Sequence, residues 1–243
     1  MCGKVWLIPF VFLMLWWSQN VNAQSSSANY TNQLWLDFNP SWNIGDRQKI
    51  IADIDYRLNW PHSWNRFVVR AGYQYKSYNS LFKRLKSEED YLAGLGFFYI
   101  IKDDGSQALE IRPYQGFKTT FFLSNRWKMR NYVRAEERFH VDLEDQTQSF
   151  GMRLRYQIST DYYVRGKIYL NGKGFYLPLA VEFFFDLVET SSANDVLRVT
   201  PGLGYQFNSD FKLQGTLGYH FTQFDKAGLN AVVYRISLYK TIF

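Results

Sequence analysis

The chain has 243 residues, a formal net charge of +6 and a mean hydropathy of −0.32, although aromatic residues make up 19% of it. After residue 23 no stretch offers 18 uncharged apolar residues, which excludes helical membrane spans. The single cysteine, Cys2, excludes disulfides and a thiolate metal site. The basic residues are spread along the chain at alternate positions, so they do not form a patch of the kind that binds nucleic acid.

The first 23 residues have the pattern of a secretory signal peptide. Lys4 supplies a positive start, residues 5–17 are apolar, and Val21-Asn22-Ala23 offers small residues for cleavage. The alternative is an uncleaved transmembrane anchor, for which the apolar run is short because about 20 residues are needed. We therefore expect cleavage after Ala23, a mature charge of +5 once Lys4 is lost, a linker over residues 24–31 and one domain over residues 32–243.

From residue 34 onward, apolar and polar residues alternate along successive stretches. This alternation predicts strands that each have one apolar and one polar face. Turn signals separate the strands, for example Asp103-Asp104-Gly105-Ser106. The charged stretch 77–90 does not alternate and predicts a long external loop. The predicted strands cover residues 34–38, 49–58, 66–76, 91–99, 109–121, 126–141, 150–158, 162–170, 175–187, 197–207, 211–221 and 232–242.

The stretch from Arg126 to Val141 shows the alternation most clearly. A helix would scatter its charges around the axis, whereas a strand collects them on one face. The residues on that face are Arg126, Lys128, Arg130, Tyr132, Arg134, Glu136, Arg138 and His140.

These strands predict an all-β fold, a transmembrane antiparallel up-and-down barrel of about twelve strands, with ten as the alternative. Bacterial barrels have even strand numbers, an apolar outer face and a polar interior. Twelve strands bring both chain ends to the periplasmic side, together with Pro61, residues 103–106, 171–174 and 208–210. A soluble sandwich would show the same alternation. Long strands, and tryptophans near strand ends as in interfacial girdles, favour the barrel. Those tryptophans are Trp35, Trp60, Trp64 and Trp127.

Several short motifs resemble a known family. They are Arg134-Ala135-Glu136-Glu137-Arg138-Phe139, Arg153-Leu154-Arg155-Tyr156, Glu182 before a Phe-rich run, Gly202-Leu203-Gly204-Tyr205 and Gly218-Tyr219. Together they resemble DUF 2490, an outer-membrane β-barrel family of unknown function from Gram-negative bacteria of the Bacteroidota. The resemblance implies a barrel in the cell outer membrane and brings no activity with it. One departure is Phe243, which is out of phase with the apolar residues of the last strand.

If the apolar faces meet lipid, the polar faces enclose a charged interior. One hypothesis is a structural network, because buried charges need partners. The other is an anion-preferring pore, because rings of arginine select anions. The candidates for either role are Arg112, Arg130, Arg134, Glu136, Arg138, Arg153, Arg155, Glu182, Arg198 and Arg235. Further inward charges are Arg57, Arg66, Arg70, Asp53, Asp55, Glu110 and Asp186.

A lipid-modifying enzyme, an acyl hydrolase or deacylase, is the alternative function. It would need a serine beside a histidine, and no serine can be matched from the sequence to His62, His140 or His220. We therefore expect a porin-like, non-enzymatic barrel without cofactor or metal, acting as a narrow passive channel or a structural or interaction barrel. The expected partners are outer-membrane lipids and lipopolysaccharide, the barrel-assembly machinery during insertion and, for an open lumen, a small anionic solute.

Overall fold

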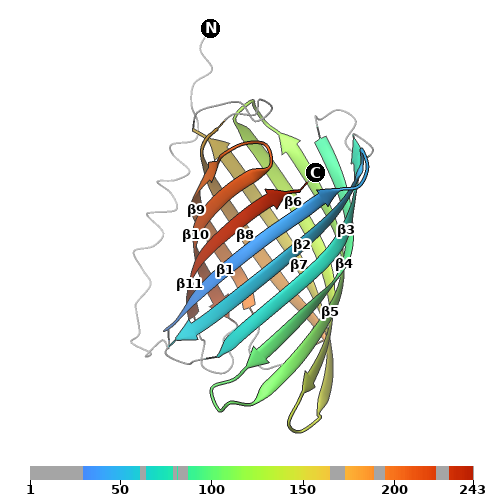
Figure 1. Ribbon diagram of the computed structural model, residues 1–243, viewed down its shortest axis with the longest axis vertical. Coiled ribbons are helices and arrows are strands. Elements are labelled where there is room, and N and C mark those ends of the chain that lie inside the picture. The colour runs from blue at the N-terminus through green and yellow to red at the C-terminus, as the bar shows by residue number, and fades with distance from the viewer. Residues whose placement is uncertain are drawn as a thin grey trace, which may run out of the picture.

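The structure, a computed structural model, describes residues 30–60, 64–78, 81, 87–164, 173–188, 195–222 and 230–242. Eleven strands close into a single barrel in these residues (Figure 1). No described helix has the length and apolar character that crossing a membrane requires. The strands are β1 Tyr30–Asn43, β2 Gln48–Trp60, β3 Asn65–Tyr78, β4 Ser87–Ile101, β5 Gln107–Phe122, β6 Trp127–Asp142, β7 Gln148–Tyr163, β8 Gly174–Val188, β9 Asp195–Gln206, β10 Phe211–Thr222 and β11 Asn230–Thr241.

Each strand pairs antiparallel with the next, except where the barrel closes. There β1 pairs parallel with β11, from Tyr30 beside Asn230 to Ser41 beside Thr241. Odd-numbered strands therefore all run the same way. We call the end at which β1 and β11 finish the upper rim, and the end at which they begin the lower rim, as they stand in Figure 1.

The expected strand number of twelve was wrong, as was the alternative of ten. Residues 150–158 and 162–163 belong to one continuous strand, β7, and residues 165–172 lie outside the described part of the chain. In the sequence, Ser159 and Asp161 look like a break between two strands. In the structure both side chains face inward and accept hydrogen bonds from Arg130, at 3.2 and 2.9 Å. The connection 207–210 consequently lies at the upper rim and the turn 102–106 at the lower rim, whereas the sequence placed both on one side.

The two faces of the wall differ as the alternation predicts. In β4, Leu95 and Phe97 are exposed on the outside, while Phe98, the residue after Phe97, is 2% exposed inside. In β2, Ile54 and Tyr56 are exposed outside, and Asp55 is fully buried inside. The barrel therefore buries charge and exposes large apolar side chains, the reverse of a soluble domain.

The predicted loop 77–90 is shorter in the structure. Residues 87–90 continue β4 as partners of β5, and Ser77 and Tyr78 belong to β3. The charged residues mislead because they are satisfied within the wall: Gln74 donates to Asp90 at 2.8 Å, and Lys76 pairs with Glu88 at 3.0 Å.

The tryptophans divide between the two faces. Trp60 ends β2 at the lower rim and Trp127 begins β6 at the upper rim, both exposed on the outside. Trp35 is instead 5% exposed inside the barrel, and Trp64 lines the lower interior. The girdle prediction was wrong for these two. For Trp35 the reason is its parity in β1, since Leu36 and Phe38 face outward.

Candidate functional site

Three glutamates organise the charges on β5–β8. Glu110 accepts hydrogen bonds from Arg112 at 2.7 Å and Arg138 at 2.6 Å. Glu136 pairs with Arg134 at 2.7 Å and with Arg155 at 2.8 Å. Glu182 pairs with Arg155 and, at 3.1 Å, with Arg198 of β9. Arg155 thus joins two carboxylates, and the chain of ion pairs crosses five strands.

A second group of ion pairs lies around β2 and the closure. Asp55 accepts from Arg57 at 2.8 Å and from Arg70 at 3.1 Å, and Arg70 also pairs with Asp53 at 3.1 Å. On the other side of β1, Arg235 pairs with Asp37. Because the Asp55 and Asp37 carboxylates are buried, removing their arginines would leave an uncompensated charge.

Aromatic rings pack against the guanidinium groups of several of these arginines. The Arg57 guanidinium carbon lies 3.9 Å from the centre of the Trp35 ring, and that of Arg198 lies 5.2 Å from it. Arg198 also lies 4.8 Å from Phe184, and Arg112 lies 3.9 Å from Phe98. Stacking on aromatic faces holds a planar guanidinium in place while its N–H edge stays available.

The interior contains two cavities. The lower one, about 590 Å³, begins near Gln33 and Asn59, and the upper one, about 690 Å³, ends near Asp46 and Asp210. The same four residues border both cavities: Asp53, Gln157, Thr200 and Arg235. These four residues therefore lie at the boundary between the two spaces.

The lower cavity has a surplus of positive charge. Ten arginines line it, whereas seven carboxylates of the described residues form ion pairs with arginines among them. The buried Nε atoms of Arg57, Arg112 and Arg134 have no hydrogen-bond partner in the described part of the protein. The interior therefore contains arginine N–H groups that no acceptor of the described residues satisfies.

The structure gathers most of the predicted site residues in this lower cavity. Arg130 and Glu136 are the exceptions; Arg130 lines the upper cavity and pairs with Asp161 at 2.9 Å. Glu136 lies behind the arginines that it pairs with. Those lining the lower cavity are Arg112, Arg134, Arg138, Arg153, Arg155, Glu182, Arg198 and Arg235.

Sequence reasoning missed the inward aromatics Phe98 and Phe184, and also the lysines of the upper cavity. Strand parity could have found Phe184, which shares its face with Glu182 and Asp186. Likewise, Lys49 shares the inner face of β2 with Asp53, and Lys212 shares the inner face of β10 with His220.

The strand register also matches a serine to a histidine, which the sequence alone could not do. His140 of β6 lies opposite Ser149 of β7 and opposite Glu110 of β5, all on the inner face. Both oxygens of Glu110 are already engaged by arginines, however, so this row lacks a carboxylate free to orient the histidine. His220 packs edge-on against Trp35 at 5.4 Å, and His62 lies outside the described residues.

Residues 32–230 match the model of a family described as protein of unknown function (DUF2490). The chain belongs to this family. No curated protein and no solved structure matches it. Within the described residues there is no group of three or more His, Cys, Asp or Glu that could hold a metal ion. For this DUF2490 barrel the interior charges and the two cavities are therefore the features from which a function has to be argued.

Proposed function

We propose that this DUF2490 protein is an outer-membrane β-barrel, exported by a cleaved signal peptide, whose interior is a narrow passive channel that prefers anions. The outer wall supports the membrane location. Exposed residues such as Leu95, Phe97, Phe139 and Ile236 belong to different strands and cover the barrel with apolar side chains. An apolar surface of this extent is costly in water and matches lipid.

The observation that carries the channel proposal is that the two cavities follow one another along the barrel and share the boundary residues Asp53, Gln157, Thr200 and Arg235. Eight-stranded barrels fill their interior with side chains, and those of about sixteen strands leave a wide aqueous channel. Eleven strands lie between these cases. A path that passes through both cavities at the shared boundary suits small solutes only.

The preference for anions follows from the surplus of arginine in the lower cavity. Rings of Arg or Lys favour anions by direct attraction and by excluding cations. The role is passive in this proposal, because every feature described so far binds or repels charge and none requires a chemical step.

The experiment is a planar bilayer recording of the refolded mature protein, with heat-modifiable mobility on a gel as the check of folding. We expect small, stable openings whose reversal potential in a KCl gradient favours chloride. Charge reversal by Arg134→Glu or Arg138→Glu should reduce that preference. A silent bilayer with correctly folded protein would overturn the channel and leave a closed structural or interaction barrel.

A second candidate, an acyl hydrolase, has the pairing of Ser149 with His140 in its favour. The serine hydroxyl would attack the ester carbon while the histidine accepts its proton and then passes it to the departing lipid alcohol, and water would release the fatty acid from the acyl-serine by the same route. The test is release of fatty acid from phospholipid vesicles by the wild-type protein and by Ser149→Ala. Release that disappears in the variant would support the hydrolase, and release that is absent or equal in both would reject it.

A further inference from the structure

The lysines of the upper cavity fall into two groups. Lys76 and Lys118 each pair with a carboxylate, namely Glu88 at 3.0 Å and Asp90 at 2.8 Å. Lys49, Lys212 and Lys240 also line the cavity, but none of them forms an ion pair with any residue that the structure describes. These three lysines therefore leave positive charge on the cavity wall that no carboxylate of the described residues neutralises in an ion pair.

The surroundings of Lys212 are positive as well. It lies within electrostatic range of Lys49, Lys128 and Arg130, and also of Asp161, a carboxylate that already pairs with Lys128 and Arg130. Like charges held close together in a protein wall repel one another, and a bound anion relieves that repulsion.

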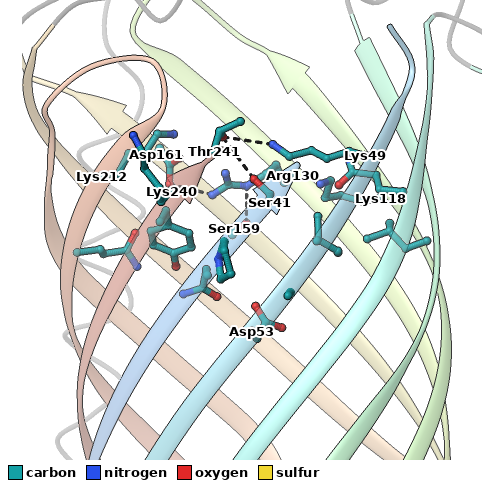
Figure 2. A pocket seen from close by; sticks show the side chains of 18 of the residues that line it. Ser41, Lys49, Asp53, Lys118, Arg130, Ser159, Asp161, Lys212, Lys240 and Thr241 are labelled. Atoms are coloured by element: carbon teal, nitrogen blue, oxygen red, sulfur yellow. Dashed lines mark hydrogen bonds and ion pairs between the residues drawn. The ribbon is translucent and has the colours of Figure 1, made fainter. Parts of the chain in front are cut away.

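Hydroxyl groups lie between Lys49 and Lys212. Lys49 Nζ donates to Thr241 Oγ1 at 3.5 Å, and Thr241 Oγ1 lies 3.4 Å from Ser41 Oγ. Figure 2 shows Lys49 and Lys212 reaching into the cavity from opposite sides, with Ser41 and Thr241 between them. Two ammonium groups and two hydroxyls form a set of donors that suits tetrahedral oxyanions.

The connections at the two rims differ in charge. At the upper rim, the described connecting residues 44–47, 81, 123–126, 164, 173 and 207–210 contain three Lys or Arg and two Asp. At the lower rim, the described connecting residues 64, 102–106 and 143–147 contain one Lys and four Asp or Glu.

One of these lower carboxylates is held in its charged form. The nearby Ser106 hydroxyl and a hydrogen bond from the backbone N–H of Ser106 lower the pKa of Asp104 in the β4–β5 turn. An opposite charge at the two mouths would draw an anion to the upper rim, because attraction of this kind raises the local concentration of a charged ligand.

From these observations we propose that Lys49 and Lys212, with Ser41 and Thr241, form a binding site for a phosphate or sulfate group at the upper mouth. The ligand is a small solute that carries this group, since a cavity of about 690 Å³ is within the size range of small-molecule sites. Lysine suits this group because its ammonium is a compact point charge, whereas the arginines deeper in the barrel present planar forks. The site would select the class of solute that the proposed channel carries, so its biological role rests on the channel proposal.

The test measures binding separately from transport. Inorganic phosphate and inorganic sulfate are titrated by calorimetry into the mature protein, refolded in a neutral detergent, as wild type and as the double variant Lys49→Gln with Lys212→Gln. We expect the double variant to bind at least about tenfold more weakly, because two charge-assisted contacts are lost. The matched control is Lys102→Gln at the lower rim, where Lys102 pairs with Asp142 at 2.6 Å, and it should bind as the wild type does.

The outcomes separate this site from the channel. Phosphate binding that depends on the two lysines, in a protein that does not conduct, would keep the site and reject the channel. Equal binding by wild type and double variant would overturn the site even if the protein conducts. A lipid headgroup is the other source of phosphate. If the substitutions weaken binding to vesicles of anionic phosphatidylglycerol but not to inorganic phosphate, the solute proposal is overturned in favour of a lipid contact.

Discussion

Arg235 of β11 donates a hydrogen bond to Asp37 of β1 across the parallel pair that closes the barrel. Asp37 is fully shielded from solvent in its side chain and also accepts a hydrogen bond from Ser237 at 2.8 Å. The two strands are the first and the last of the chain, so this interaction depends on closure and forms only once the whole barrel has been assembled.

We therefore predict that Arg235→Met destabilises the barrel by about 3–5 kcal/mol, because it leaves the Asp37 carboxylate buried without its cation. The measurement is urea unfolding in lipid vesicles, followed by heat-modifiable mobility. The double variant with Asp37→Leu should recover a large part of the loss, since both charges are then gone. If the single and double variants are equally unstable, the pair contributes nothing specific to closure.

The inward glycines of β4 provide space for a neighbouring ring. A Cβ added to Gly94 would lie 2.5 Å from Tyr114 Cζ, so the ring fills the space that the missing side chain leaves. We predict that Gly94→Ala costs about 1–3 kcal/mol through this overpacking. The control is Gly215→Ala on β10, where the added Cβ meets no atom within 4 Å. Equal unfolding midpoints for the two variants would contradict the packing seen at Tyr114.

The position of Trp35 can be tested by fluorescence. In a variant that retains Trp35 alone, brominated lipids should leave the emission unchanged, because the ring faces the interior. Iodide should quench it more than caesium does, because Arg57, Arg198 and Arg235 surround the ring. A variant that retains only Trp60, which is exposed on the outer wall, should show quenching by the lipids. Quenching of Trp35 by brominated lipid would contradict its placement in the interior.

Much of this architecture could be predicted from the sequence because alternation reports the face on which a side chain lies. Arg134, Glu136 and Arg138 are inside for that reason, and so are their partners. Strand number could not be obtained in the same way. Ser159 and Asp161 look like a break until Arg130 is known to lie opposite them.

The wrong strand number also changed which connections were assigned to each rim. With twelve strands, residues 208–210 belong with the turn 103–106, and the charges of the two mouths are mixed. With eleven strands they lie at opposite ends, and the basic and acidic connections separate. The pair Lys49 and Lys212 was also invisible at the sequence level, because it depends on the register across the closure, where β2 and β10 flank β1 and β11.

The outer wall offers the most direct test of the membrane proposal. Leu95 lies near the middle of β4 and is exposed on the outside, so in a bilayer it would face the hydrocarbon core. We predict that Leu95→Arg destabilises the folded protein in vesicles by about 2–4 kcal/mol, the cost of a cation at the bilayer midplane. Ile44→Arg is the control, because Ile44 is an exposed apolar residue in the upper-rim turn, where a charge remains hydrated. Unfolding in urea from vesicles of phosphatidylcholine measures both variants. If Leu95→Arg and Ile44→Arg have the same small effect, the apolar wall is not in contact with lipid, and the proposed location in the outer membrane falls with it.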